Sequence, residues 1–366
     1  MSMTRETYIR PIGLYPAQIG NQANGVWGCL RLASGWLDFS ALEIIERKAL
    51  QIERRITGLS DFMELDWGRC TLSASKTYDY LQTPRARIKG LSLDKPRVMG
   101  IVNVTPDSFF DGARYTDTEA AIIHGKKLVD EGADILDVGG ESTRPGSDAV
   151  PENLELDRVI PVIEGLAGQV DALISIDTRK SSVMQQAINS GVDLINDVSA
   201  LTYEPDSLKL VAKANVPVIL MHAQGEPKTM QNHPTYRDVV LDVFDYLESR
   251  VDACISAGIP HSRIIIDPGI GFGKTLAHNL SLLSHLSLLH GLGLPILVGA
   301  SRKSFITHLT SCQTAEKRLS GSLAAACHAV SQGVQIIRVH DVLETSQALK
   351  VWQSSSQGIM DNVIAL

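Results

Sequence analysis

The sequence predicts an α/β fold, a (β/α)8 TIM barrel with a small N-terminal α+β extension. From residue 97 onward, short β-branched runs alternate with polar turns and segments of helical length, which is typical of parallel strands covered by helices. Eight such runs extend over roughly 270 residues, close to the ~250 that this barrel usually needs. A doubly wound sheet is the structural alternative, but it normally carries a dinucleotide fingerprint after its first strand, and GIVNVTPDSF has none.

Residues 1–84 do not follow this alternation and are expected to form the extension, with the catalytic barrel over residues 85–366. NGVWGCLRLASGWLDF predicts a strand and a turn, and SALEIIERKALQIERR predicts an amphipathic helix that begins at Ser40. We expect the extension to pack on the barrel or on a partner subunit. The next segment, RARIKGLSLDKPR, predicts a hairpin that plugs the bottom of the barrel.

The eight expected strands are, in order, VMGIV, DILDV, LISID, VDLIN, VPVILM, RIIID, PILVG and QIIRV. The first connecting segment, TEAAIIHGKKLVDEGA, predicts a helix with Ile122, Lys126 and Val129 at helical spacing and Gly132 at its end. Polar residues stand at or just beyond the end of every strand: Asn103, Asp137, Asp177, Asn196, His222, Asp267, Ser301 and His340. One such residue can simply cap the next helix, but eight in register indicate a shared site, because the carboxyl ends of barrel strands converge on one mouth.

Composition excludes several classes of protein. The net charge of −7 and the pI near 5.8 disfavour nucleic acid or an anionic membrane as a partner. Five dispersed cysteines without Cys-x-x-Cys spacing indicate reduced thiols, and the N-terminus lacks an apolar signal core. The sequence therefore predicts a cytoplasmic protein.

The motifs at the expected strand ends combine covering loops, carboxylate and amide side chains, and cationic side chains. NVTPDSFFDG and GGESTRPGS read as loops that cover a ligand, GASRKSF brings Arg302 and Lys303 to the mouth, and RVHDV adds Arg338 and His340. Carboxylates and amides suit a heterocycle with adjacent donors and acceptors, and cationic groups suit a phosphate leaving group. DPGIGFGKT is not a phosphate loop, because Pro268 stands where that pattern requires glycine.

These motifs together resemble the bacterial dihydropteroate synthase family in order and separation. The motifs that carry the resemblance are MGIVNVTPDSF, DVGGESTRPG, SIDT with LINDVSAL, LMHAQGEPKTMQ, DPGIGFGK, SRKS, RLSGSLAAA and IIRVHDV. They cover about residues 85–352 and leave the extension outside. The resemblance implies a transferase of folate biosynthesis, which condenses p-aminobenzoate with 6-hydroxymethyl-7,8-dihydropterin diphosphate to give 7,8-dihydropteroate and diphosphate.

The resemblance also implies a role for individual residues. Those expected to bind the pterin are Asp177, Asn196, Met221, Asp267 and Lys303; those expected to bind the diphosphate are Asn103, Thr143, Arg338 and His340. Those expected around p-aminobenzoate are Thr143, Arg144, Pro145, Phe272 and Ser301, and Lys303, Arg338 and His340 are the expected catalytic residues. Asn103 is the expected contact of a Mg²⁺ cofactor. Lys274 is expected to be a minor basic neighbour, and Arg179 to point into solvent.

The family further implies a homodimer, inhibition by sulfonamides, and closure of the Asn103–Gly112 and Gly139–Ser147 loops over the site. Two other functions fit the same fold. A methyltetrahydrofolate–corrinoid methyltransferase shares the barrel and the pterin pocket, but it does not need the basic SRKS and RVHDV pairs. A non-catalytic pterin-binding homologue is expected to have damaged loops, whereas Asn103, Thr143 and Lys303 are present.

Overall fold

The computed structural model describes residues 6–17, 28–48, 51–64, 72–104, 117–142, 147–226 and 228–357. Its main body is a barrel of eight parallel strands, hydrogen-bonded in the order β12-β11-β10-β9-β8-β7-β14-β13. A parallel bridge between Ile266 and Ile296 joins the two end strands and brings the sheet close to full closure. The strands are β7 (Arg97–Asn103), β8 (Ile135–Gly139), β9 (Leu173–Asp177), β10 (Leu194–Asp197), β11 (Val218–Met221), β12 (Ile264–Asp267), β13 (Leu297–Val298) and β14 (Ile336–Val339). All eight predicted strands are confirmed.

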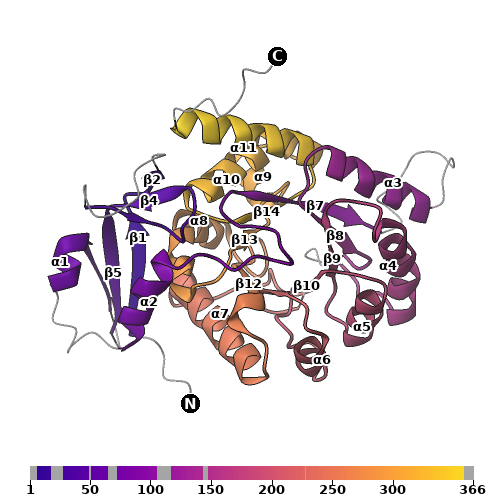
Figure 1. Cartoon of the computed structure of the whole chain (residues 1–366), viewed down its shortest axis with the longest axis horizontal. Coiled ribbons are helices and arrows are strands. Elements are labelled where there is room, and N and C mark those ends of the chain that lie inside the picture. Colours follow the sequence, from indigo (N-terminus) through magenta and orange to yellow (C-terminus); the bar gives the residue numbers. More distant parts are fainter. Residues whose placement is uncertain are drawn as a thin grey trace.

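Helices surround this barrel (Figure 1). They are α3 (Asp117–Asp130), α4 (Glu152–Leu166), α5 (Ser181–Asn189), α6 (Ser207–Ala214), α7 (Val239–Ser256), α8 (Leu276–Ser284), α9 (Ser304–Thr310), α10 (Leu319–Ser331) and α11 (Val342–Gln357), with the 3-10 turns η1 (His261–Arg263), η2 (Leu286–Leu292) and η3 (Glu316–Arg318). Among the described residues, no helix combines the length and the apolar character that crossing a bilayer requires.

The first of these helices, α3, was predicted correctly, but its buried face lies one residue away from the predicted one. Ala121, Gly125 and Leu128 are buried, whereas Ile122 and Val129 are half-buried and Lys126 is exposed. Gly125 lies where two neighbours approach closely, because a Cβ there would lie 3.0 Å from Leu166 of α4 and 3.4 Å from Leu136 of β8. After the helix, Gly132 takes a φ of +105°, as expected of a residue that ends a helix.

The bottom of the barrel is closed by the predicted hairpin. Ile88 and Leu91 form an antiparallel bridge, and Ile88 and Leu93 are buried. They pack against one inward-facing residue from each of seven strands: Met99, Ile135, Leu194, Ile219, Ile265, Leu297 and Ile336. Arg97 holds the hairpin by donating to Ser92 O at 2.7 Å and pairing with Asp134 at 2.9 Å. The plug thus keeps the barrel interior apolar at one end and leaves polar chemistry to the other.

In its described residues, the extension consists of two small antiparallel sheets and two helices. One sheet has the order β1-β5-β6 and the other the order β2-β4-β3. The elements are β1 (Thr7–Ile12), β2 (Tyr15–Pro16), β3 (Leu30–Arg31), β4 (Leu37–Phe39), β5 (Ala41–Arg47), β6 (Ile52–Gly58), α1 (Leu59–Glu64) and α2 (Leu72–Gln82). The strand and turn predicted from NGVWGCLRLASGWLDF are present as β3 and β4 in its described part.

The amphipathic helix predicted at residues 40–55 was wrong, because this segment forms the strands β5 and β6. Leu42 and Ile44 are buried and alternate with the half-buried Glu43, which is the two-residue period of a strand. β5 is paired on both sides, with β1 and with β6. Helix propensity is a weak preference, and two flanking strands override it here.

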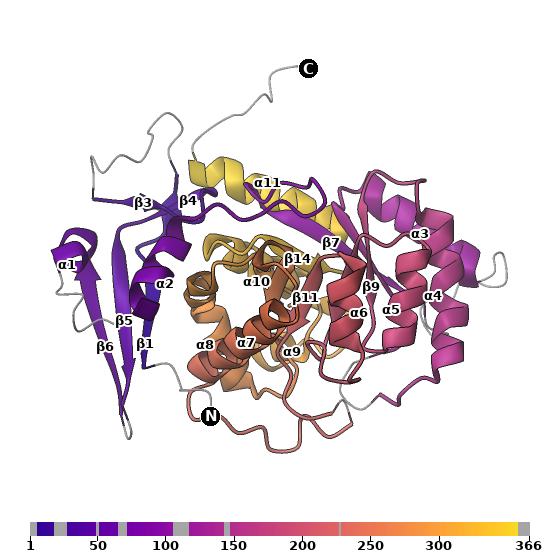
Figure 2. The same cartoon turned by 60° about the horizontal axis from the view of Figure 1, so that its bottom comes forward.

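The extension packs on the α7–α8 side of the barrel, away from α3, α4 and α5 (Figures 1 and 2). Its buried residues, among them Tyr8 and Phe39, belong to the same hydrophobic core as the barrel helices. Tyr8 meets Phe244 of α7 edge-on at 5.4 Å between ring centroids, and Trp36 Nε1 donates to Val330 O at 3.1 Å. The extension therefore shares a core with the barrel.

Replacing Ile88 by alanine tests the plug. The change removes a buried side chain from the barrel floor, so the free energy of unfolding should fall by about 2–5 kcal/mol. Urea unfolding followed by circular dichroism measures this value. Lys95→Ala, at an exposed site on the same segment, is the control and should stay within about 0.5 kcal/mol of the parent. Equal stability of the two variants would show that the hairpin does not support the barrel.

Candidate functional site

An arginine that bridges two carboxylates lies at the centre of the barrel mouth. Arg338 of β14 donates from Nε to Asp137 Oδ2 at 2.6 Å and from Nη2 to Asp177 Oδ2 at 2.7 Å. Asn196 of β10 donates from Nδ2 to the same oxygen of Asp137 at 3.0 Å. The side chain of Asp137 is fully buried, whereas that of Arg338 is 21% exposed. The cluster joins four strands, and the guanidinium is accessible from the mouth.

Burial sets the protonation of this cluster. It raises the pKa of Asp177 to about 7, against the attraction of Arg338, and the nearby Asp137 charge raises it further. Burial alone would lower the pKa of Arg338, but Asp137 and Asp177 raise it above its ordinary value. Arg338 therefore stays charged, and Asp177 lies close to its point of protonation at neutral pH.

One oxygen of each carboxylate lacks a hydrogen-bond partner among the described residues. These atoms are Asp137 Oδ1 and Asp177 Oδ1. Buried polar atoms are nearly always hydrogen-bonded, to protein or to ordered water. Buried acceptors on two carboxylates that share one arginine therefore suit a ligand with N–H groups.

Asp267 ends β12 and is held by the glycine-rich turn that follows. Gly269 N donates to Asp267 Oδ1 at 2.7 Å. Burial raises the pKa of Asp267, while the Gly269 N–H, Lys303 and Arg338 act in the opposite direction. Asp267 is thus within electrostatic reach of both cations.

Close backbone approach explains the glycines of this turn. Gly269 has a φ of +67°, and a Cβ there would lie 1.9 Å from His222 O. Gly273 has a φ of +62°, and a Cβ there would lie 2.3 Å from Gln224 O. A side chain at either position would collide with backbone, so the turn can only lie against residues 222–224 as glycine.

Lys303 and Phe272 lie together on the face of this turn. Lys303 Nζ donates to Ile270 O at 2.7 Å and stands 3.9 Å from the centroid of the Phe272 ring. A cation over an aromatic face is an attractive contact. The structure thus brings together two residues that lie thirty-one positions apart in the sequence.

Ser301 and His340, which follow β13 and β14, form a second pair. Ser301 Oγ lies 3.0 Å from His340 Nδ1, and His340 N donates to Ser301 Oγ at 3.3 Å. Arg302, predicted at the mouth beside Lys303, instead pairs with Asp341 at 3.0 Å from its Nε. Ser301 and His340 thus contact each other beyond the ends of β13 and β14, whereas the Arg302 guanidinium is engaged by a carboxylate outside the central cluster.

Lys274, predicted to be a minor basic neighbour, is a buried lysine behind the turn. Lys274 is only 3% exposed, and its Nζ lies 2.9 Å from His222 Nδ1 and 3.0 Å from Phe272 O. Burial lowers the pKa of Lys274 to about 7 and that of His222 to about 3. Lys274 therefore clamps the end of β11 to the Phe272 turn, which is more than a minor neighbour would do.

The expectation that Arg179 points into solvent was wrong. Its side chain is 11% exposed, pairs with Glu141 at 2.7 Å and stacks on the ring of Tyr203 at 4.1 Å. Lys180 also pairs with Glu141, at 2.5 Å, and contacts Glu155 of α4. Paired carboxylates explain why two adjacent bases are buried here. Glu141 thereby anchors the start of the GGESTRPGS loop.

The other predicted site residues divide into described and undescribed ones. Asn103 is half-buried at the end of β7, and Met221 is 4% exposed at the end of β11, paired in register with Asp267. Thr143, Arg144 and Pro145 lie outside the described residues, as does most of the NVTPDSFFDG loop. Sequence reasoning assigned no site role to Asp137, although it had noted its position in the series of strand-end polar residues.

Comparison with known proteins finds similarity to one family over most of the chain. A family model described as pterin binding enzyme matches residues 99–340 of this chain. A dihydropteroate synthase of Haemophilus influenzae is 46% identical over 271 residues, which make up 74% of this chain and 98% of that protein.

Two solved structures extend the comparison to three dimensions. A Xanthomonas albilineans dihydropteroate synthase with 4-aminobenzoic acid has 51% sequence identity and a TM-score of 0.70, covering 74% of this chain and 98% of that one. A Yersinia pestis dihydropteroate synthase in complex with a sulfonamide drug has 47% identity and a TM-score of 0.69, covering 72% of this chain and 96% of that one.

The pH dependence of stability tests the burial of Lys274. Its pKa is about 7 in the fold and near 10.5 when exposed, so above pH 7 the unfolded chain holds a proton that the folded chain has released. Stability should therefore rise with pH between 7.5 and 9.5, by at most about 1.4 kcal/mol per unit from this group. We expect the difference in unfolding free energy between the parent and Lys274→Met to grow over that range. A constant difference would mean that Lys274 stays charged in the fold.

Proposed function

The chain belongs to the dihydropteroate synthase family of pterin-binding enzymes, and from that premise we propose a reaction and a site. The reaction joins p-aminobenzoate to 6-hydroxymethyl-7,8-dihydropterin diphosphate and releases diphosphate. The observation that carries the site assignment is the Arg338 cluster, in which two buried carboxylates each keep an oxygen without a partner among the described residues. This arrangement offers acceptors to a heterocycle and a cation to an anion at one place.

In this proposal the pterin lies over the strand ends, against Asp177, Asn196 and Asp267. A pterin ring presents adjacent N–H donors, and ionised carboxylates are pure acceptors. Met221 and the stem of Lys303 supply apolar contacts for the ring. The fully buried Asp137 has no predicted contact of its own; it orients Asn196 and Arg338 through the bonds described above.

The proposed partners of the diphosphate are Asn103, Thr143, Arg338 and His340, of which Thr143 lies outside the described residues. Arg338 is the most exposed member of its cluster, so an incoming anion can reach it from the mouth. Its planar fork suits phosphate oxygens. A diphosphate that engages Arg338 would free Asp177 for the pterin, which links the two halves of the substrate.

Mg²⁺ fits the donors present. Asn103 offers an amide oxygen at the end of β7, and the described part of the chain contains no group of three or more His, Cys, Asp or Glu residues placed so that they could hold a metal ion. Mg²⁺ commonly keeps several waters and takes substrate phosphate oxygens, so one protein oxygen near a diphosphate is a fitting donor set. When bound, the ion would neutralise negative charge that develops on the diphosphate.

The proposed chemistry needs positioning more than proton transfer. As the methylene–oxygen bond of the pterin breaks, its electron pair leaves with the diphosphate and positive charge grows on the methylene. The neutral aryl amine then supplies its lone pair to form the new carbon–nitrogen bond and loses a proton to solvent. Arg338 and His340 stabilise the leaving anion, and Phe272, Ser301 and Lys303 border the aryl amine. Arg144 and Pro145, with Thr143, would exclude water by closing the second loop.

Four further expectations from the sequence and the family belong to this proposal. The active form is a homodimer, the enzyme is cytoplasmic, and sulfonamides compete with p-aminobenzoate, as the Yersinia pestis complex suggests for a relative. Residues 1–84 form the extension and residues 85–366 the catalytic unit. Neither alternative function gains support, because the relatives described above are dihydropteroate synthases.

Turnover tests the function directly. Purified protein with Mg²⁺, p-aminobenzoate and the pterin diphosphate should form dihydropteroate, detected by chromatography. Lys303→Ala should lower kcat/KM by roughly 100-fold and raise both KM values, because Lys303 lies between the two proposed subsites. Lys317→Ala, at an exposed site outside them, is the control. No product from the parent would refute the function, and undiminished activity of Lys303→Ala would refute the site.

Proton release tests the role of Asp177. Its pKa of about 7 without ligand means that it is partly protonated at pH 6.5, and pterin N–H donors should favour the ionised form. Binding of 6-hydroxymethylpterin should therefore release up to one proton near pH 6.5 and strengthen as the pH rises toward 7.5. Calorimetry in buffers of different ionisation enthalpy measures this release, which Asp177→Asn should abolish. Binding without proton release would place the pterin elsewhere.

A further inference from the structure

We propose that the N-terminal extension is a positioning element for the aryl-amine side of the site. Its β5–β6 hairpin holds the segment 223–238, of which all residues but Pro227 are described, and this segment holds the turn that carries Phe272. The inference rests on the proposed function for the identity of the substrate. The coupling itself rests on contacts between described residues, which run without a break from the extension to the turn.

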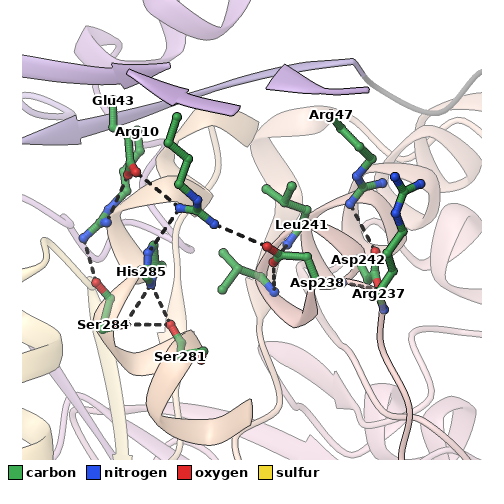
Figure 3. Close-up of polar contacts among 12 residues, drawn as sticks. Arg10, Glu43, Arg47, Arg237, Asp238, Leu241, Asp242, Ser281, Ser284 and His285 are labelled. Carbon is green, nitrogen blue, oxygen red and sulfur yellow. Dashed lines mark hydrogen bonds and ion pairs between the residues drawn. The ribbon is translucent and has the colours of Figure 1, made fainter. Parts of the chain in front are cut away.

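The first contact is at the N-terminus of α7. Asp238 caps this helix, because its Oδ1 accepts from Val240 N at 3.0 Å and Leu241 N at 3.1 Å. Its other oxygen accepts from Arg54 Nη2 of β6 at 3.3 Å. Figure 3 shows Asp238 between the extension above and the helix below. The residue that starts α7 is therefore held from both sides.

Two more arginines, Arg47 and Arg237, fix the same helix end. Arg47 pairs with Asp242 at 3.1 Å and with Asp245 at 2.5 Å, and its side chain is only 8% exposed. Arg237 donates from Nη2 to Lys48 O at 2.8 Å, while Arg237 N donates to Asp242 Oδ2 at 2.8 Å (Figure 3). An exposed pair contributes about 0–1 kcal/mol, but three contacts on one helix end restrict its movement together.

The same junction reaches the helix that follows the turn. Arg10 donates from Nη2 to Ser284 O at 2.7 Å, at the end of α8, and pairs with Glu43 at 3.2 Å. Arg54 pairs with Glu43 as well, and its Nη1 lies 3.4 Å from His285 Nε2. The extension thus touches both α7, which follows the 223–238 segment, and α8, which follows the Phe272 turn.

The 223–238 segment passes the constraint to the turn. Tyr236 Oη donates to Gly273 O at 2.7 Å, and Gln231 Nε2 donates to Gly271 O at 2.7 Å. Gln224 braces the segment internally through two bonds to Thr235, at 3.0 and 3.1 Å. The carbonyls on both sides of Phe272 are therefore held by the segment that the extension anchors.

The glycine-rich turn then determines the positions of Phe272 and Lys303. A Cβ at Gly271 would lie 3.0 Å from Lys303 Cδ, so the lysine stem rests directly on the turn. Asp177, Asn196 and Arg338 stand on paired strands outside this chain of contacts, whereas Asp267 and Lys303 are the pterin residues that touch the turn. Most of the proposed pterin and diphosphate contacts are therefore independent of the turn, while Phe272 lies on it. Loosening the extension should therefore affect the aryl amine more than the pterin.

Arg54→Ala is the sharpest test. It removes the contact to Asp238 and leaves Glu43 paired with Arg10, so no buried carboxylate is orphaned. The KM for p-aminobenzoate should rise roughly three- to tenfold, with the KM for the pterin diphosphate within about twofold of the parent. Arg54→Lys, which keeps the charge, should give an intermediate value. Asp238→Asn, which keeps the cap, should behave like Arg54→Ala.

Arg55→Ala is the matched control. Arg55 is the next residue of β6, its side chain is 52% exposed, and it contacts Glu46 only at 3.9 Å. Both KM values should stay unchanged in this variant. A lower melting temperature of Arg54→Ala with both KM values unchanged, or with both raised equally, would overturn the proposal in favour of a purely stabilising extension.

A double-mutant cycle tests the path. Tyr236→Phe should also raise the KM for p-aminobenzoate, and the variant that combines it with Arg54→Ala should exceed the larger single effect only slightly. Additive effects would contradict a shared path. Amide hydrogen exchange gives a readout without turnover: residues 269–274 should exchange faster in Arg54→Ala than in Arg55→Ala. If the parent made no dihydropteroate, the proposed function would fail while exchange still decided the coupling.

Discussion

A single guanidinium shared by two carboxylates sets the architecture of this site. Arg338 can reach Asp137 and Asp177 only if β14, β8 and β9 keep their register in one closed sheet. Losing the cation would leave the fully buried Asp137 uncompensated, a situation that costs about 3–5 kcal/mol in proteins. The plug closes the opposite end of the barrel with apolar side chains. The charged groups of the barrel interior are therefore confined to the mouth.

The strands were predictable because each is a short β-branched run between turn residues, and that signal is local. The same holds for the strand-end polar residues, whose convergence follows from barrel geometry alone. Asp177, Asn196 and Asp267 are buried at the mouth as that geometry requires. The plug was predictable too, because the hairpin that contains Ile88 and Leu93 directly precedes the first barrel strand and therefore lies at the barrel's lower end. Their partners come from seven strands, so the burial is collective.

What could not be predicted depends on partners distant in sequence. The segment from Ser40 to Arg55 has helix-compatible spacing, and only its pairing with β1 and the packing of Tyr8 on Phe244 make it a sheet. Lys274 looks like any lysine after a glycine, since its burial comes from His222, fifty-two positions earlier. Arg179 is buried because Glu141 and Tyr203 meet it in space. In each case a tertiary contact decided against a local preference.

The glycine turn after β12 also limits how this site can change over generations. Codon changes at Gly269 or Gly273 would drive a side chain into the carbonyl of His222 or Gln224, and a backbone atom cannot move aside. Mutations can therefore change the shape of this face of the site only at the half-exposed Phe272, at Lys303, or at the more distant side chains that hold the turn. A substitution in the extension, far from the barrel mouth, is then one of the few changes by which selection could alter this face of the site without disturbing the backbone of the turn.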